Sequence, residues 1–310
     1  MAIEALQMCS FSPFLEQELR ARFVLHRWFE IVETERFLRE QAHSVRAVVT
    51  GGHIGVPPEL VARLPALGIV AINGVGFDKV DLEEARRRGI RVSITPNVLT
   101  DDVADLAVGL VIALLRDIPA SDRHVREGLW PVRERPLSRK VSGRRFGIIG
   151  LGNIGSAIAA RLAPFGSIAY SDLKPKQSPY EFVPSAAQLA RQSEVLILAT
   201  TANASTRQLV GREVLEALGP NGYLVNVARG SLVDEEELIR ALRDRRIAGA
   251  ALDVFADEPR VPESLRSMPN VILTPHIASA TVETREAMAR AVVANLDAYF
   301  AGQPPPGAIA

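Results

Sequence analysis

Three side chains in the last third of the sequence are of the types that transfer protons on an anionic substrate. His276 lies in LTPHIASAT, and its imidazole can give or take a proton near neutral pH. Glu258, in LDVFADEP, can hold such an imidazole in one tautomer. Arg229, in VNVARGSLVDEEEL, carries a planar guanidinium that can grip a carboxylate and a neighbouring oxygen together. Taken singly, the arginine could equally form a surface ion pair, and a lone histidine is more often structural.

A glycine-rich turn precedes these residues and suits a dinucleotide. The stretch GIIGLGNIGSAIAARLAPFGSIAYSD has the pattern of a strand, a helix and a second strand. Gly150 permits the tight turn, Gly152 lets the backbone approach a pyrophosphate, and Gly155 lets helix and strand pack closely. Asp172 follows Gly150 by 22 residues, where a carboxylate accepts hydrogen bonds from the adenosine ribose and repels the extra phosphate of NADP. The alternative is a glycine-rich turn without a ligand, but these features together favour dinucleotide binding.

The elements that must position these residues alternate between strand and helix. Short β-rich runs occupy 45–52, 68–76, 89–96, 145–150, 167–172, 194–200, 223–228, 248–255 and 270–276. This alternation predicts parallel sheets with helices on both faces, and therefore an α/β protein. One long, mostly apolar helical segment from Thr100 to Gly128 separates the strands into two groups, and an amphipathic helix starts at Thr281.

Composition limits the partners of the chain. Its 310 residues, 47% of them hydrophobic, leave room for two domains. Lys plus Arg and Asp plus Glu balance at 36 each, so no net field favours nucleic acid or a membrane surface, and a small molecule is the expected partner. The single cysteine, Cys9, and an acidic N-terminal segment favour a cytoplasmic location. The longest apolar run, Ala107–Leu115, is far below the ~18 residues of a membrane span and predicts a buried helix.

Four motifs in a fixed order carry a resemblance to a known family. They are GIIGLGNIG, NVARGSLVDEEEL, GAALDVFADEP and LTPHIASAT, and the earlier NGVGFDKVDLEEARRRGIRVSITPNVLTDDVADLAVGL matches as well. The chain resembles the D-isomer-specific 2-hydroxyacid dehydrogenases, particularly the glyoxylate/hydroxypyruvate reductases and hydroxyphenylpyruvate reductases. The resemblance implies two doubly wound parallel-sheet domains, Rossmann-like or flavodoxin-like, with a cleft between them. It assigns residues 1–96 plus 282–310 to a substrate-binding domain and residues 97–281 to a dinucleotide-binding domain.

The resemblance also assigns roles to individual residues. It implies that His276 is the catalytic acid/base, that Glu258 pairs with it, and that Arg229 binds the carboxylate and carbonyl of the substrate. The backbone N–H groups of Val75 and Gly76 would hold the carboxylate from the other domain. The residues expected at the cofactor are Thr100, Gly150, Leu151, Gly152, Asn153, Ile154, Gly155, Asp172, Val227 and Asp253, the last near the nicotinamide carboxamide. No metal ligand is expected.

The implied reaction is hydride transfer from NAD(P)H to the C2 carbonyl of a 2-oxo acid, which gives a D-2-hydroxy acid. Glyoxylate and hydroxypyruvate are the foremost substrates, with an aromatic (hydroxyphenyl)pyruvate as the alternative. Two other functions are compatible with the same scaffold: an NAD-sensing regulator that is not an enzyme, and an enzyme that oxidises formate or phosphite. The full set of Arg229, Glu258 and His276 argues against the regulator. Glu258 argues against formate, because formate dehydrogenases of this kind usually have Gln there.

The sequence also indicates which cofactor the chain prefers and how it assembles. Relatives that prefer NADPH usually have a small residue followed by Arg where this chain has Asp172 and Leu173, so NAD(H) is favoured. Lys174 and Lys176 nevertheless leave NADP(H) open. Relatives usually dimerise through the helix that here starts near Thr100, so we expect a homodimer. The segments 51–55 and 129–137 are candidates for shaping the pocket at the side-chain end of the substrate.

Overall fold

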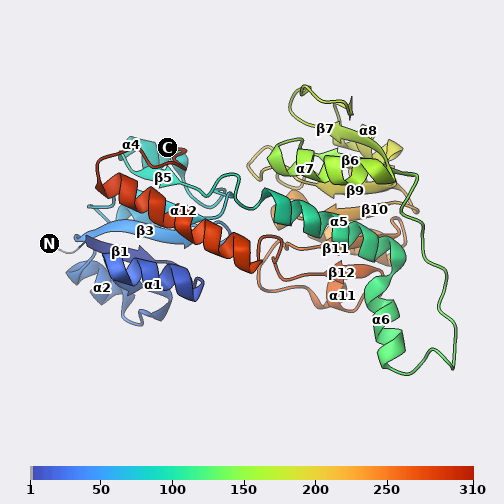
Figure 1. Cartoon of the computed structure of the whole chain (residues 1–310), viewed down its shortest axis with the longest axis horizontal. Coiled ribbons are helices and arrows are strands. Elements are labelled where there is room, and N and C mark those ends of the chain that lie inside the picture. Colours follow the sequence, from blue (N-terminus) through green and yellow to red (C-terminus); the bar gives the residue numbers. More distant parts are fainter. Residues whose placement is uncertain (1–2) are drawn as a thin grey trace. The chain divides into compact units, whose positions relative to one another are not determined.

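The structure, a computed structural model, describes residues 3–310 and divides them into two compact units (Figure 1). The first unit contains the described residues up to Leu99 together with Thr281–Ala310, and the second is Thr100–Ala280. Each unit has its own parallel sheet with helices packed on it, which confirms the predicted α/β class.

The first unit is built on a five-stranded parallel sheet with the order β2-β1-β3-β4-β5. Its strands are β1 (Ile3–Gln7), β2 (Phe23–Arg27), β3 (Val45–Gly51), β4 (Ile69–Asn73) and β5 (Arg91–Ser93). Its helices are α1 (Pro13–Arg22), α2 (Thr34–Glu40), α3 (Pro58–Ala62), α4 (Leu82–Arg87) and α12 (Val282–Phe300), with the short η1 (Trp28–Glu30). This is the flavodoxin-like order, in which the chain winds outward from β1 in both directions.

Both faces of this sheet are covered. Alternate strand residues feed two apolar clusters, as expected for a parallel sheet with helices on each side. On one face α1 and α12 contribute Leu19 and Val292. On the other face Phe37, Leu60 and Ala85 come from α2, α3 and α4. The helix predicted from residue 281 is therefore part of the first unit, and its Thr281 side chain caps it.

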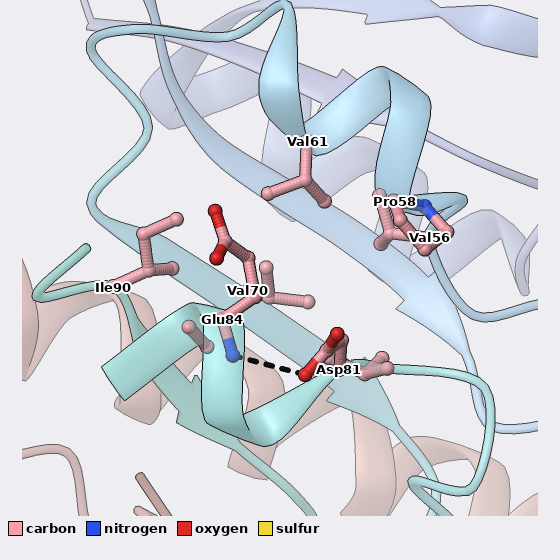
Figure 2. A pocket seen from close by; sticks show the side chains of 9 residues that line it. Val56, Pro58, Val61, Val70, Asp81, Glu84 and Ile90 are labelled. Carbon is pink, nitrogen blue, oxygen red and sulfur yellow. Dashed lines mark hydrogen bonds between the residues drawn. The ribbon is translucent and has the colours of Figure 1, made fainter. Parts of the chain in front are cut away.

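A small, mostly apolar depression lies between α3, α4 and β4 (Figure 2). Val61, Val70 and Ile90 are among the residues that line it. Asp81 also lines it, but its Oδ1 accepts a hydrogen bond from the Glu84 N–H at 2.9 Å and so caps α4. The depression is part of the packing of these two short helices.

Residues after α12 run along β5, the edge strand of the first sheet. The Ile309 N–H donates to the Val92 carbonyl at 2.8 Å, and the Ile94 N–H donates to the Gly307 carbonyl at 2.9 Å. Asn295 of α12 fastens this segment by donating to the Ile94 carbonyl and accepting from the Gly307 N–H. Because an uncovered edge strand presents unpaired backbone groups, this segment protects one edge of the sheet.

The second unit is built on a seven-stranded parallel sheet with the order β12-β11-β10-β9-β6-β7-β8. Its strands are β6 (Arg144–Ile149), β7 (Gly166–Ser171), β8 (Glu181–Phe182), β9 (Val195–Leu198), β10 (Tyr223–Asn226), β11 (Gly249–Leu252) and β12 (Val271–Leu273). Its helices are α5 (Thr100–Arg116), α6 (Ile118–Arg126), α7 (Asn153–Leu162), α8 (Ala186–Gln192), α9 (Arg212–Leu218), α10 (Glu235–Arg243) and α11 (Glu263–Arg266), with η2 (Ala163–Phe165) and η3 (Gly230–Leu232). Counted from β6, this is the Rossmann order 3-2-1-4-5-6 with one further strand. The order reverses between β6 and β9, and open α/β sheets bind ligands at such a point.

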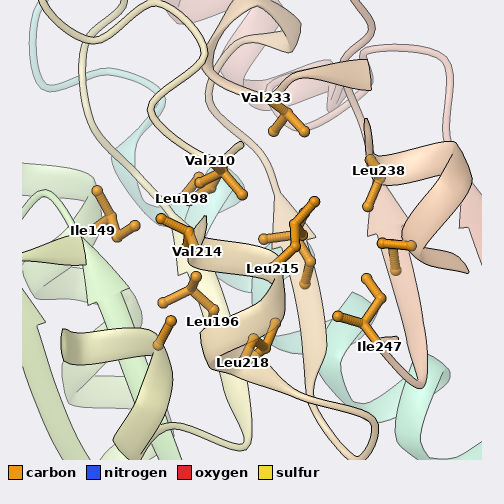
Figure 3. Packing of buried hydrophobic residues seen from close by; sticks show 14 of the residues in the cluster. Ile149, Leu196, Leu198, Val210, Val214, Leu215, Leu218, Val233, Leu238 and Ile247 are labelled. Carbon is orange, nitrogen blue, oxygen red and sulfur yellow. The ribbon is translucent and has the colours of Figure 1, made fainter. Parts of the chain in front are cut away.

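Helices α8, α9 and α10 form the apolar core of one face of this second sheet. Figure 3 shows Val214, Leu215 and Leu218 of α9 with Leu196 of β9 and Leu238 of α10 among the cluster. Helices α5 and α7 pack against each other, and α5 also contacts β10, β11 and β12. The predicted burial of the apolar run in α5 is thus observed for one side of that helix.

Each predicted strand region contains a strand, but some elements were not predicted. Strands β1, β2 and β8 fall outside the predicted regions. Phe23 is the one buried residue of β2, so the sequence of β2 lacks a clear alternation. The long segment from Thr100 was predicted as one helix, which is wrong: it is broken between α5 and α6. Asp117 adopts a left-handed conformation with φ of 51°, and Pro119 has no N–H to continue the helix.

Candidate active site

The glycine-rich turn joins β6 to α7 and requires its glycines for different reasons. Gly150 has φ of 93°, and a Cβ there would lie 2.7 Å from the Thr200 Cα in the segment after β9. A Cβ on Gly155 would lie 1.9 Å from the Gly150 carbonyl oxygen, so helix and turn are in direct backbone contact. A Cβ on Gly152 would meet nothing within 4 Å. Of the three glycines, Gly152 alone has open space beside its backbone, whereas Gly150 and Gly155 lie against other backbone atoms.

Asp172 lies directly after β7 and faces this turn. Its Oδ2 accepts a hydrogen bond from the Leu151 N–H at 3.0 Å, and its Oδ1 accepts one from the Leu173 N–H at 2.7 Å. The Lys176 Nζ lies 3.7 Å from the same Oδ2. An open backbone at Gly152, the start of α7 at Asn153 and a carboxylate beside the turn are the features that hold a pyrophosphate and a ribose. These residues fit a nicotinamide dinucleotide.

His276 and Glu258 form a close pair at the carboxyl end of the same sheet. The His276 Nδ1 lies 2.7 Å from the Glu258 Oε2, while the Glu258 Oε1 accepts a hydrogen bond from the Phe255 N–H at 3.1 Å. Because an ionised carboxylate only accepts, this contact places a proton on Nδ1 and holds the ring in one orientation. His276 has φ of 53°, an uncommon conformation for a non-glycine residue that often marks functional sites.

Asp253 holds the segment that carries the histidine. It is fully buried, its Oδ1 accepts from the Thr274 hydroxyl at 2.7 Å and from the Ile277 N–H at 2.9 Å, and its Oδ2 accepts from the Ala278 N–H at 2.9 Å. The His276 N–H also donates to the Asp253 carbonyl at 2.8 Å. These contacts give Asp253 a part in positioning residues 274–278, which the sequence did not indicate. Its placement at the nicotinamide carboxamide stays a prediction.

Parallel register brings Arg229 to the same edge of the sheet. The last residue of β10, Asn226, is in register with Leu252 of β11, and Leu252 with Leu273 of β12. Arg229, Glu258 and His276 therefore follow three neighbouring strands. The Arg229 main chain is fixed by the Asn226 amide, which donates to its carbonyl at 2.9 Å. A Cβ on the next residue, Gly230, would lie 1.9 Å from the Phe255 carbonyl carbon, so the segments after β10 and β11 touch.

The other predicted cofactor residues also lie in the second unit. Thr100 is the first residue of α5, Asn153 and Ile154 begin α7, and Val227 follows β10 and is buried. The structure brings the turn 150–155 and Asp172 together directly through the Leu151 N–H, whereas within residues 3–310 neither Thr100 nor Val227 is hydrogen-bonded to them.

Val75 and Gly76 lie in the first unit, in the loop that follows β4. Within residues 3–310 neither N–H donates to a main-chain carbonyl, which is the state required of an anion-binding amide pair. A Cβ on the preceding Gly74 would lie 3.6 Å from the Gly52 nitrogen, so this loop is next to the one after β3. The predicted substrate segment 51–55 and the predicted carboxylate-binding amides are neighbours at one edge of the first sheet.

Comparison with known proteins assigns the chain to a family. Residues 108–278 match the family described as "D-isomer specific 2-hydroxyacid dehydrogenase, NAD binding domain". The chain is 48% identical over 305 residues to the hydroxyphenylpyruvate reductase of Plectranthus scutellarioides, which covers 98% of this chain and 97% of that protein. The chain belongs to the D-isomer specific 2-hydroxyacid dehydrogenase family. The resemblance drawn from the four sequence motifs is thus confirmed.

Further relatives of this dehydrogenase carry related names. It is 47% identical over 304 residues to the glyoxylate/hydroxypyruvate reductase A of Arabidopsis thaliana, covering 97% of each protein. The crystal structure of an NADPH-dependent glyoxylate/hydroxypyruvate reductase from Sinorhizobium meliloti, in complex with NADP and malonate, superposes with a TM-score of 0.92 at 40% identity, covering 100% of this chain and 97% of that one. The two-domain fold of this dehydrogenase therefore matches that of an experimentally determined reductase.

Two other kinds of site are absent from the described part of the chain. No group of three or more His, Cys, Asp or Glu side chains in residues 3–310 is arranged to hold a metal ion. No helix in the same range combines the length and apolar content needed to cross a membrane.

Proposed function

We propose that this dehydrogenase reduces the C2 carbonyl of a small 2-oxo acid, with glyoxylate or hydroxypyruvate foremost, to the D-2-hydroxy acid. The observation that carries the proposal is the 2.7 Å contact between His276 Nδ1 and Glu258 Oε2, at the same carboxyl edge of the parallel sheet as the glycine-rich turn. It is supported by the names of relatives 47% and 40% identical to this chain.

Each protein group has a separate task in this mechanism. In the second unit, the Arg229 guanidinium binds the carboxylate of the substrate and polarises its carbonyl oxygen. In the first unit, the Val75 and Gly76 N–H groups are the amides proposed for binding a carboxylate. When bound, the nicotinamide dinucleotide supplies the hydride that reaches C2. Because Nδ1 of His276 is engaged by Glu258, the proton for the carbonyl oxygen comes from Nε2. Glu258 stabilises the imidazolium before that transfer, and solvent returns the proton afterwards.

An aromatic 2-oxo acid is the second candidate substrate. The specific observation in its favour is that the relative with 48% identity is a hydroxyphenylpyruvate reductase. Glyoxylate carries no side chain, hydroxypyruvate carries a hydroxymethyl group, and hydroxyphenylpyruvate carries a ring. The three acids therefore differ in the volume they require near residues 51–55 and 129–137.

NAD(H) is the proposed preferred cofactor, and NADP(H) the alternative. The support for NAD(H) is the Asp172 carboxylate beside the turn, where it would accept from ribose hydroxyls and repel a 2′-phosphate. The support for NADP(H) is the similarity to the NADPH-dependent glyoxylate/hydroxypyruvate reductase from Sinorhizobium meliloti.

The proposed assembly is a homodimer formed through the second unit, and the proposed location is the cytoplasm. Exposed apolar side chains support the dimer: Trp130 is 72% exposed, Val132 75% and Leu137 99%. Large apolar side chains this exposed, close together in the sequence, are typical of a protein interface. The location rests on the single cysteine of the chain, which has no second cysteine to pair with.

Initial rates test the proposed function. Purified protein is assayed with NADH and with NADPH against glyoxylate, hydroxypyruvate and 4-hydroxyphenylpyruvate, following nicotinamide absorbance. Turnover of either small acid is the expected result, and preference for the aromatic acid would favour the second candidate. Binding of NADH without turnover of any 2-oxo acid would contradict the proposal and favour a non-enzymatic NAD-sensing role.

A further inference from the structure

The segment after β7 holds a lysine over the Asp172 carboxylate. Lys176 Nζ lies 3.7 Å from Asp172 Oδ2, the oxygen that also accepts from the Leu151 N–H of the glycine-rich turn. The Asp172 side chain is 15% exposed, whereas the Lys176 side chain is 39% exposed. The carboxylate is thus held against the turn, while the ammonium lies on its solvent side and keeps freedom to move.

A buried tyrosine fixes the main chain of this lysine. The Lys176 N–H donates to the Tyr170 hydroxyl at 2.7 Å, and the same hydroxyl donates to the Lys176 carbonyl at 3.2 Å. Tyr170 is 1% exposed, and its ring packs against Phe182 of β8 with a centroid distance of 5.5 Å. An exposed ion pair between residues four apart usually contributes little to the free energy of folding. Here the backbone of the lysine is anchored to the core, so the reach of its side chain is limited to the neighbourhood of Asp172.

The Asp172 carboxylate and the Lys176 ammonium differ in how they affect the binding of NADH and NADPH. A lone carboxylate accepts from the ribose hydroxyls of NADH but repels the 2′-phosphate of NADPH. An ammonium on a flexible stem can form a charge-assisted hydrogen bond with either the carboxylate or a phosphate. Lys174, two residues earlier, is exposed and makes no ion pair within residues 3–310.

We propose that Lys176 is a cofactor-specificity residue: it pairs with Asp172 when NADH is bound and with the 2′-phosphate when NADPH is bound. The site then accepts both dinucleotides, with Asp172 still held by the Leu151 and Leu173 N–H groups in the second case. This inference rests on the proposed use of a nicotinamide dinucleotide, but not on which substrate is reduced.

Dissociation constants measured without substrate test the inference. They are obtained from nicotinamide fluorescence for NADH and NADPH with the full-length protein, Lys176→Gln and the matched control Lys174→Gln. We expect Lys176→Gln to raise the dissociation constant of NADPH about tenfold, because one charge-assisted contact is lost. The dissociation constant of NADH should change less than about twofold. Lys174→Gln should leave both constants within about twofold of the unchanged protein. For the unchanged protein, NADPH binding should also weaken more steeply with added salt than it does for Lys176→Gln.

A second variant separates the position of the lysine from its charge. Tyr170→Phe keeps the ring against Phe182 and the charge of Lys176, but removes both hydrogen bonds that anchor the lysine backbone. Tyr170→Phe should weaken NADPH binding severalfold, while NADH binding and the thermal midpoint change little. Equal weakening of both dinucleotides by Lys176→Gln, or equal effects of the two lysine variants, would overturn the inference.

The same data distinguish this inference from the proposed function. NADH and NADPH binding with the expected pattern, but without turnover of any 2-oxo acid, would refute the reductase and leave the role of Lys176 supported. Failure of the unchanged protein to bind either dinucleotide would refute both.

Discussion

At the scale of single residues, His276 depends on groups from two neighbouring segments. Glu258 fixes its ring through Nδ1, and Asp253 fixes its backbone and the residues that follow it. Both carboxylates use their second oxygen on a backbone N–H, so neither is free to rotate away from its partner. Orientation of the imidazole is thus built into the second unit before any ligand binds.

Replacing the histidine tests its role as acid. His276→Gln should bind NADH within about twofold of the unchanged protein but lose roughly 10²–10⁴-fold in turnover, the usual contribution of a general acid. The measurements are the NADH dissociation constant and the rate with the preferred 2-oxo acid. His43→Gln, at an exposed position of the first unit, is the control and should keep full activity. A parallel loss of NADH affinity in His276→Gln would contradict the assigned role.

At the scale of elements, the β6 turn and α7 depend on two glycines in different ways. Gly152→Ala should fold with a nearly unchanged thermal midpoint, since its φ of −82° and ψ of −160° suit any residue and the added Cβ meets no protein atom. It should weaken NADH binding by about tenfold or more, because the pyrophosphate is expected to lie against this backbone. Unchanged NADH affinity in Gly152→Ala would show that the dinucleotide does not approach there.

Gly155→Ala should instead destabilise the second unit, since its Cβ would lie 1.9 Å from the Gly150 carbonyl oxygen. Gly109→Ala is the control within a helix: no atom lies within 4 Å of the added Cβ, and alanine favours a helix by about 0.5–1 kcal/mol over glycine. Thermal unfolding followed by circular dichroism should give a lower midpoint for Gly155→Ala and an equal or higher one for Gly109→Ala.

The ends of β6 and β9 are joined by an ion pair that makes stability depend on pH. Burial raises the pKa of the Glu194 carboxyl, but the Arg144 side chain and the Arg145 N–H outweigh it and hold this pKa below its ordinary value of 4.5. A carboxyl whose folded-state pKa is lowered contributes stability above its unfolded-state pKa and loses it as the pH falls through the folded-state value.

Glu194→Gln should therefore lower the free energy of unfolding at pH 7 by about 1.5–3 kcal/mol, the range for hydrogen bonds to a charged group. The difference from the unchanged protein should shrink as the pH is lowered below the ordinary range of a glutamate. Denaturant unfolding across this pH range checks the prediction. Glu134→Gln, at an exposed position, should show no such pH-dependent difference.

Sequence patterning predicted the continuously buried strands but missed β1, β2 and β8. Buried strands such as β3, β6 and β9 are runs of apolar residues, because parallel strands are covered on both faces. Strands β2 and β8 lie at sheet edges, where exposure removes the pattern. In the site, motif spacing likewise predicted part of the arrangement: the glycine-rich turn, Asp172 and the Glu258–His276 pair. The anchoring of Lys176 by Tyr170 and of residues 274–278 by Asp253 arises from tertiary contacts that spacing does not encode.

At the scale of the whole molecule, the exposed apolar surface of the second unit predicts its association. Sedimentation at micromolar concentration should give the mass of a dimer, and the double variant Trp130→Ser, Leu137→Ser should dissociate at least about tenfold more readily, because burial of both side chains is lost. Val32→Ser removes a side chain of the first unit that is 94% exposed and should leave association unchanged. A monomer at this concentration would contradict the proposed assembly.

The return of α12 to the first unit has a consequence for synthesis on the ribosome. Residues of Thr100–Ala280 form a contiguous unit, whereas the first unit needs Thr281–Ala310 to cover one face of its sheet and to pair with β5. While the chain is being translated, Ile69 and Ala71 of the first sheet lack their packing partners in α12. These partners, Val292 and Leu296, are synthesised only near the end of the chain. The unit encoded second is thus the one that can complete its fold first, and the described residues up to Leu99 stay incompletely folded until the end of the chain is made.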